Sequence, residues 1–346
     1  MSALVTGFAP MSKRLEGERS ERLEQASRRM YYHHSFLDDV TRGIGPHDLI
    51  ILSAPTGLGK TQLALSIAME NAKLGKRVHY FALEAEPREL ERRAKYAEIS
   101  RLAHAAQHPE ASTLSYQDWF FGDCEGVAEQ YDALADDAVA HGFPSLSTFY
   151  RGARFTAADL AREVARIHER TDMIVVDHLH YIDEDVETSE AKALGDTVKA
   201  IRDVALLIGK PIILVAHLRK RERGKMRRLI ADYEDIHGSS NVVKICTQII
   251  ILERAEDIEA PRWWLSPTYV VLEKDRRGGR CRFVAVQNFD LRLKSYASRY
   301  TLGLVKSNKW EELPPGDVPR WARSHIPMAP QQTLPGADHP NAPGAS

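Results

Sequence analysis

The sequence DLIILSAPTGLGKT, residues 48–61, decides the fold of this chain. Its apolar first half predicts a buried strand, its two glycines predict a turn, and Gly-Lys-Thr is typical of a helix start. In such a sequence, the backbone N–H groups of small residues surround a polyphosphate, and the positive end of the helix faces the anion. The stretch therefore predicts a phosphate-binding loop formed by Ala54, Pro55, Thr56, Gly57, Leu58, Gly59, Lys60 and Thr61.

Two side chains of this loop have predicted roles. Lys60 would contact the β- and γ-phosphates of a nucleotide, and the Thr61 hydroxyl would bind Mg²⁺. The eight-residue pattern has glycine where this chain has Ala54, so an ordinary strand–turn–helix is the alternative. Apolar residues before the loop and in the following helix, where Leu63 and Ile67 share a face, favour the nucleotide site.

Composition narrows the class of protein. Of the 346 residues, 43% are hydrophobic, which suits one large domain with appendages or two small domains. The net charge of −1 provides no global attraction to nucleic acid, so such a contact would need a local patch. The three cysteines (Cys124, Cys246 and Cys281) are scattered, which favours a reducing compartment over a disulfide framework or a cysteine zinc site. We find no long apolar run and no secretory leader, and therefore expect a cytoplasmic protein.

Two further apolar segments are each followed by a carboxylate. Residues 77–83 predict a strand before Glu84, and residues 173–176 predict another before Asp177. Ligands of parallel α/β sheets bind beyond the carboxyl ends of the strands. Glu84 there can activate the water that attacks a γ-phosphate, although helix capping is an alternative and Glu86 is a rival. Asp177 can bind the Mg²⁺ beside the phosphate loop.

The strand predicted for residues 211–216 leads into His217 and then into a basic segment. His217 can contact the γ-phosphate and report its loss, or it can be a hydrogen-bonded core histidine. The basic segment, which no aromatic residue interrupts, predicts sequence-independent contacts to nucleic-acid phosphates; a solvated loop is the alternative. A predicted helix start beyond it would offer backbone N–H groups to a phosphate. The candidate DNA-binding residues are Arg219, Lys220, Arg221, Arg223, Lys225, Arg227, Arg228, Gly238, Ser239 and Ser240.

Three other regions complete the chain. The charged segment 12–34 predicts a helix that docks on its own domain or on a neighbouring subunit, or else remains solvated. Residues 87–141 predict mostly helices packed on one edge of the domain. A β-hairpin is expected from strands 268–277 and 280–286, and the basic residues at its tip are either solvated or form an arginine finger. The Pro-rich end, residues 301–346, is expected to be disordered.

Taken together, the order of these elements resembles the RecA-like motor domain of DnaB-type hexameric helicases, which include the phage primase-helicases and the mitochondrial helicase Twinkle. The resemblance is collinear over about residues 36–296, and alanine in place of the first glycine of the loop is familiar in that family. It rests on segments 43–49, 54–61, 81–84, 174–179, 216–220, 238–254 and 274–276.

The resemblance implies an α/β fold: a RecA-like P-loop NTPase core with a mostly parallel central sheet, flanking helices and a C-terminal β-hairpin. The motor domain would span residues 36–300 with a helical insertion at 100–141, after an N-terminal segment 1–35 with a linker helix. Because only about 35 residues precede the motor, the family's N-terminal collar or primase domain is not expected in this chain.

The resemblance also implies residue roles. Lys60 and Thr61 would hold phosphates and Mg²⁺, Glu84 would activate water, Asp177 would bind the metal, and His217 would sense the γ-phosphate. The loop from Arg219 to Ser240 would line a channel and grip single-stranded DNA. Lys274 and Arg276 would act on the ATP of the adjacent subunit, with Arg277 as the rival to Arg276.

From these features we expect an ATP- and Mg²⁺-dependent ring, hexameric in form, that translocates on single-stranded DNA as a replicative helicase of a phage or mobile element. A primase or helicase loader is the expected partner. The alternative is a RecA/KaiC-like ATPase without helicase activity, such as a recombination mediator, a regulatory switch or a defence protein. A third class is a nucleotide-binding scaffold without turnover.

Overall fold

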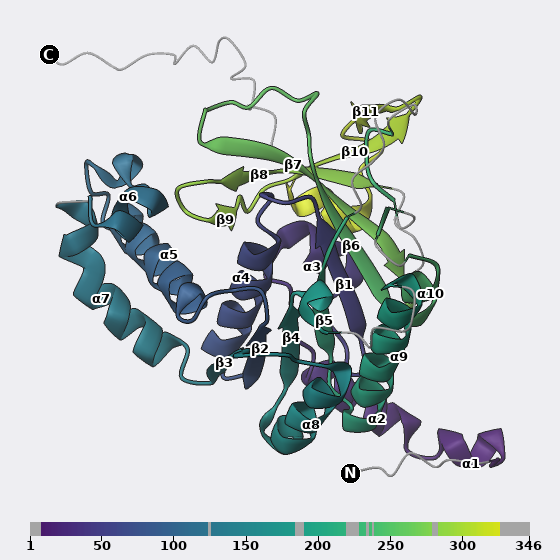
Figure 1. The fold of residues 1–346 in the computed structure, drawn as a ribbon. Helices are drawn as coiled ribbons and strands as arrows, with labels where there is room; N and C mark the ends of the chain where they lie inside the picture. Colours follow the sequence, from purple (N-terminus) through teal and green to yellow (C-terminus); the bar gives the residue numbers. More distant parts are fainter. Residues whose placement is uncertain are drawn as a thin grey trace, which may run out of the picture.

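A mixed sheet of eleven strands forms the centre of the protein (Figure 1). The computed structural model describes residues 8–123, 126–183, 190–218, 228–232, 235–236, 239–278 and 283–325. The strand order is β11-β10-β8-β7-β6-β1-β5-β4-β2-β3, with β9 paired to β8. The first six strands in the chain run parallel: β1 (Leu49–Ala54), β2 (Val78–Ala82), β3 (Leu146–Tyr150), β4 (Met173–Asp177), β5 (Ile212–His217) and β6 (Gln248–Arg254).

The remaining strands pair antiparallel beyond β6. They are β7 (Leu265–Asp275), β8 (Val284–Asp290), β9 (Ser295–Tyr296), β10 (Thr301–Lys306) and β11 (Lys309–Glu312). The predicted hairpin is thus confirmed as the β7–β8 pair. The RecA-like α/β core predicted from the sequence is also confirmed, since six parallel strands carry helices on both faces.

Strand β1 lies in the middle of the sheet, and all six of its residues are buried. It pairs with β5 on one side and with β6 on the other. Strands covered on both faces are apolar throughout rather than alternating, which is why the run at 49–52 is continuous. Successive side chains enter opposite cores, so Ile50 packs in one core cluster and Ile51 in the other.

Helices cover the two faces of the sheet (Figure 1). The face that receives Ile50 is covered by α3 (Ser35–Thr41), α4 (Lys60–Lys73) and the start of α5 (Glu89–Ala105). The opposite face is covered by α8 (Ala157–Ile167), α9 (Glu190–Ile208) and α10 (Ser239–Ile245). Helix α9 buries the apolar stripe of Leu194, Val198, Ile201 and Ala205, because spacings of three and four residues return to the same side of a helix. Short 3₁₀ turns occupy His168–Arg170 and Leu179–Tyr181.

A helical lobe stands beyond the β3 edge of the sheet (Figure 1). It consists of α5, a 3₁₀ turn (Ala111–Thr113), α6 (Tyr116–Phe121) and α7 (Val127–Gly142). The lobe has its own small core, in which Ile99 and Ala103 of α5 meet Tyr131 and Ala135 of α7. This arrangement agrees with the helical segment expected at one edge of the domain.

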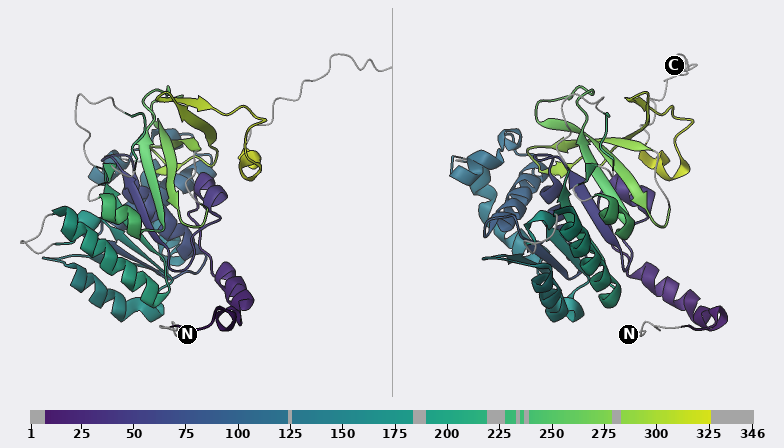
Figure 2. Two further views of the ribbon diagram at one scale, coloured as in Figure 1. Left: turned by 90° about the vertical axis from the view of Figure 1, so that its right-hand side faces the viewer. Right: turned by 45° about the vertical axis from the view of Figure 1, so that its right-hand side comes forward.

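The N-terminal region differs from the single helix expected over residues 12–34. It forms α1 (Met11–Leu15) and α2 (Glu18–Ser27), which project away from the sheet (Figure 2). Gly17 separates them with a φ of 82°, a left-handed conformation that interrupts a helix. Neither helix contains a buried residue, and Met30 instead pairs with Ile44 in an isolated bridge.

The prediction of a disordered tail from residue 301 is wrong for its first part. Strand β10 pairs with β8, and β11 pairs with β10; a 3₁₀ helix follows at Arg320–His325. Leu302, Val318 and Ala322 are buried in the main core. The segment is short and polar by itself, but the open edge of β8 provides a template for it. Residues 326–346 lie outside the described residues. In the described ranges, no helix is both long and apolar enough to cross a bilayer.

Candidate nucleotide-binding site

The loop between β1 and α4 has the backbone that its glycines predict. Gly57 and Gly59 adopt φ values of 86° and 75°, which other residues rarely adopt. A Cβ at Gly59 would also lie only 3.2 Å from the Phe289 ring, so this position excludes a side chain twice over. Ala54, by contrast, is the last residue of β1 and has no positive φ. Alanine is therefore acceptable where the pattern has glycine.

Four predicted site residues converge at the carboxyl edge of the parallel strands. Lys60 begins α4, and its Nζ lies 3.1 Å from Nδ1 of His217, the last residue of β5. Asp177 ends β4, and Glu84 follows β2. Both carboxylates raise the pKa of Lys60, although burial, the larger effect, lowers it overall. The structure thus places a cation, two carboxylates and an imidazole around the phosphate loop.

Asp177 has the environment expected of a metal ligand. Burial raises the pKa of its carboxyl group, while hydrogen bonding from Tyr80 and Thr61 opposes that shift. The Tyr80 hydroxyl donates to Oδ2 at 2.7 Å. Oδ1 is buried, and no residue in the described ranges completes a well-formed hydrogen bond to it. A carboxylate oxygen left open beside the Thr61 hydroxyl fits Mg²⁺, which prefers oxygen ligands.

Sequence reasoning missed two histidines at this site. His178 follows Asp177 directly, and its ring stacks on that of His217 with centroids 3.9 Å apart. Burial, followed by the influence of neighbouring cationic or titratable groups, lowers the pKa of His178 to about 2. The His180 ring contacts it through the two Nδ1 atoms at 3.2 Å. The alternation His178-Leu179-His180 after a buried strand is a signal that could have identified them.

A pocket of about 270 Å³ borders the phosphate loop. Gly57 and Leu58 form one side, and β7, β8 and the segment after β6 form the rest. Its lining includes the Arg254 side of that segment, the exposed Trp263 and the Phe289 ring. The pocket is therefore open to solvent, apolar on part of its surface and continuous with the loop.

Most of the candidate DNA-binding residues lie outside the described residues; these are Arg219, Lys220, Arg221, Arg223, Lys225, Arg227 and Gly238. The segment leaves and re-enters the domain at one place, because Leu218 and Ile236 form an antiparallel bridge. Arg228 forms an ion pair with Asp232. Ser239 and Ser240 begin α10.

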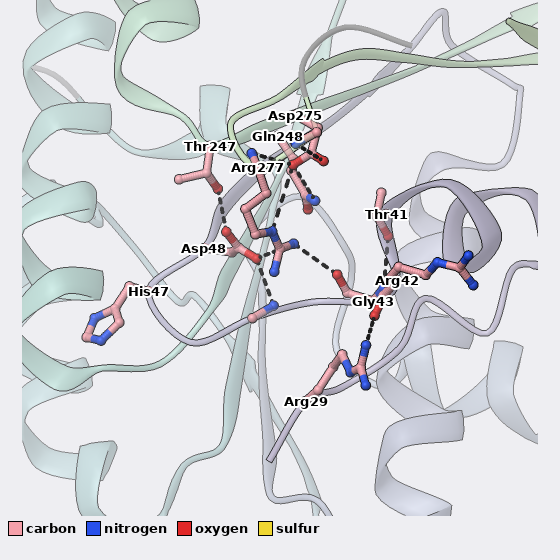
Figure 3. A network of polar contacts seen from close by, with 12 residues as sticks. Arg29, Thr41, Arg42, Gly43, His47, Asp48, Thr247, Gln248, Asp275 and Arg277 are labelled. Carbon is pink, nitrogen blue, oxygen red and sulfur yellow. Dashed lines mark hydrogen bonds and ion pairs between the residues drawn. The ribbon is translucent and has the colours of Figure 1, made fainter. Parts of the chain in front are cut away.

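The three basic residues after β7 have different surroundings (Figure 3). The Arg277 guanidinium lies 3.0 Å from the Asp48 carboxylate and donates to the Gly43 carbonyl. The Lys274 ammonium donates to two carbonyls at the end of α10, those of Val243 and Cys246. The Arg276 side chain is exposed, and it forms no hydrogen bond or ion pair with the part of the chain that the structure describes.

These features define a P-loop NTPase with a RecA-like α/β fold. The chain belongs to the DnaB-like helicase C-terminal domain family, whose model matches residues 31–296. It is 22% identical over 247 residues to the replicative DNA helicase DnaB of Leifsonia xyli subsp. xyli (strain CTCB07). That match covers 70% of this chain, but the chain spans only about half the length of the relative (50%).

Two solved structures share the fold. One is an isolated ATPase domain, which superposes with a TM-score of 0.67 at 15% identity, covering 84% of this chain and 99% of that one. The other is a DnaB-like replicative helicase, studied with its interactions with primase, which superposes with a TM-score of 0.66, also at 15% identity. That match covers 81% of this chain and 66% of the helicase.

Proposed function

We propose that the protein is an ATP-driven motor that translocates on single-stranded DNA and acts as a replicative helicase, of the kind found in phages and mobile elements. The observation that carries the proposal is the convergence of Lys60, Glu84, Asp177 and His217 around one phosphate loop. Membership of the DnaB-like family supports the reaction class. The preferred nucleotide is ATP, and the setting is the cytoplasm.

Each residue has a chemical task in this proposal. Lys60 leaves His217 and binds the β- and γ-phosphates, while Thr61 and Asp177 hold Mg²⁺, which neutralises charge that develops on the phosphates. Glu84, exposed beyond β2, orients the attacking water and accepts its proton. His217 contacts the γ-phosphate and changes its contact when that phosphate departs.

The nucleoside would extend into the pocket beside Gly57 and Leu58. Phe289 and Trp263 supply aromatic surface there, and aromatic or apolar walls are typical of nucleotide-sized sites. Since the phosphate loop forms one side of this pocket, a single nucleotide can occupy both.

The ring and its partners extend the same proposal. The segment from Arg219 through Arg228 would follow the DNA backbone, and Ser239 and Ser240 would contribute backbone N–H groups. Six copies would place Arg276 of one subunit at the phosphates of the next. Because the similar DnaB-like helicase interacts with primase, a primase, or a loader, is the partner to examine first.

The decisive experiment is steady-state ATP hydrolysis with and without single-stranded DNA over a series of salt concentrations. We expect strong stimulation that decreases with salt, because phosphate contacts release counterions. Lys60→Ala should abolish turnover by weakening nucleotide binding, whereas Glu84→Gln should retain binding and lose at least about 100-fold in turnover.

Each other outcome indicates another function. Turnover that is unaffected by DNA would exclude the helicase and support a RecA/KaiC-like ATPase. Turnover that survives Lys60→Ala would contradict the enzymatic proposal. Nucleotide binding without turnover in the parent protein would indicate a scaffold.

A further inference from the structure

A cluster of metal-ligand side chains stands at the ends of three neighbouring strands. Glu84 follows β2, His178 follows β4 and His217 ends β5, and these strands are adjacent in the sheet. Each residue offers one ligand atom, and the three atoms lie within 4.8 Å of one another. Two imidazoles and a carboxylate are a typical ligand set for Zn²⁺, with a fourth position left open.

The second observation concerns His178 itself. Its ring is fully buried, and its Nδ1 accepts from the backbone N–H of His180 at 3.4 Å. Its other nitrogen, Nε2, is buried and has no hydrogen-bond partner among the described residues. Leaving a buried polar group unpaired costs about 1–3 kcal/mol. An unpaired nitrogen beside Glu84 and His217 therefore indicates a ligand that the protein itself does not supply.

We propose that Glu84, His178 and His217 form a site for a transition-metal dication of the Zn²⁺ class in the nucleotide-free protein. Tetrahedral ligation at about 2.1 Å requires ligand atoms about 3.4 Å apart, so the cluster must contract slightly. The exposed Glu84 carboxylate can make that movement. Mg²⁺ is excluded from this position, because imidazole suits Zn²⁺, Cu²⁺ and Ni²⁺ whereas Mg²⁺ prefers oxygen.

A neighbouring histidine is placed to orient His178 as a ligand. When Nε2 of His178 binds an ion, Nδ1 carries the proton, and the His180 Nδ1 at 3.2 Å is placed to accept it. Such contacts orient ligating histidines. One group opposes the ion, namely the Lys60 ammonium, whose Nζ lies 3.1 Å from His217 Nδ1. The ion and Lys60 therefore compete for the same side of the imidazole.

Binding at this site would inhibit ATP hydrolysis. This consequence rests on the proposed function, since it assumes that Glu84 activates water and that His217 faces the γ-phosphate. An ion held by both side chains occupies the same space and withdraws the carboxylate from its task. Conversely, Mg²⁺ with a non-hydrolysable ATP analogue should displace the ion, because phosphate would bind Lys60 and His217.

The test is calorimetric titration of chelator-treated, nucleotide-free full-length protein, without a histidine tag, with Zn²⁺. Titration with Co²⁺ provides a visible absorption spectrum of the bound ion. We expect one equivalent to bind tightly. His178→Gln and the exposed Glu84→Gln should each weaken binding at least about tenfold, the loss typical even when only a partner of a ligand is changed. Lys60→Ala should tighten it severalfold, because a like charge is removed.

The control is His141→Gln, which alters an exposed histidine on α7 and should leave binding unchanged. Glu84→Gln keeps the test valid even if His178→Gln does not fold. The proposal is overturned if the parent protein binds no tighter than both variants, or if Mg²⁺ competes equally well. Binding without any effect on turnover would retain the site and contradict the proposed role of Glu84 and His217 in hydrolysis.

Discussion

The Arg277 guanidinium lies 3.0 Å from the carboxylate of Asp48, which is almost fully buried, and donates to the Gly43 carbonyl at 3.0 Å. These contacts join the turn before β1 to the end of β7 (Figure 3). Arg277 is thereby held within its own chain, whereas its neighbour Arg276 is exposed. Of the two arginines, Arg276 is the one available to reach another subunit.

We therefore predict opposite phenotypes for two adjacent substitutions. Arg277→Ala should lower the free energy of unfolding by about 1–2 kcal/mol, less than for a fully buried pair because Arg277 is half exposed. Arg276→Ala should leave stability unchanged and reduce turnover about 1,000-fold or more, as for an arginine finger. Urea unfolding and ATPase assays of both variants provide the measurement.

Mixing subunits tests whether Arg276 acts in trans. Rings that combine Arg276→Ala with Lys60→Ala subunits contain some sites in which both groups are intact. Activity should exceed that of either variant alone. Absence of rescue in rings that assemble normally would count against the assignment.

Lys274 was predicted to act on the neighbouring ATP, and the structure places its ammonium on the carbonyls of Val243 and Cys246. A cation at the C-terminus of a helix is stabilising, so Lys274→Met should destabilise the protein by about 1 kcal/mol. The measurement is thermal unfolding together with the mixed-subunit assay. Rescue in mixed rings without a change in stability would instead support a role in trans.

The glycines of the phosphate loop should differ from Ala54 in their response to substitution. Gly59→Ala combines a positive φ with a contact 3.2 Å from Phe289, so it should weaken nucleotide binding more than Gly57→Ala, where a Cβ meets nothing within 4 Å. Each costs at least about 1 kcal/mol from the left-handed backbone alone. Ala54→Gly should not tighten binding, because that position is an ordinary strand residue. Fluorescent nucleotide titration measures all three, and equal affinities for the two glycine variants would contradict the steric argument.

Stability should fall in acid through His34. Burial lowers the pKa of this histidine from 6.5 to about 4, so the folded state keeps it neutral while the unfolded state binds a proton. Its contribution is complete above pH 6.5 and is lost as the pH falls toward 4, by about 3 kcal/mol. His34→Phe, which preserves the ring packed on Tyr296, should flatten this dependence.

A second group opposes His34 over part of this range. Burial raises the pKa of Asp38 to about 6, so its protonated form is favoured by folding and stability decreases as the pH rises from about 4 to 6. Asp38→Asn should therefore steepen the loss of stability in acid. Unfolding free energies measured between pH 4 and 7 check both variants, and parallel profiles for the parent and His34→Phe would contradict the assignment.

The sequence alone determined the phosphate loop, the buried strands and the acids at their ends. These signals are local: a continuous apolar run predicts a strand covered on both faces, and glycine predicts a left-handed turn. The same reasoning placed Lys60, Asp177 and His217 at one edge, because parallel strands end together.

Only the tertiary structure decided which side chains are already engaged. It assigned Arg277 to Asp48 and Lys274 to α10, joined His178 to Glu84 and His217, and placed β10 on the edge of β8. Each of these contacts joins residues that are far apart in the chain, so neither periodicity nor local propensity carries information about it. The energy of such pairs depends on burial and distance, and both exist only after the sheet has formed.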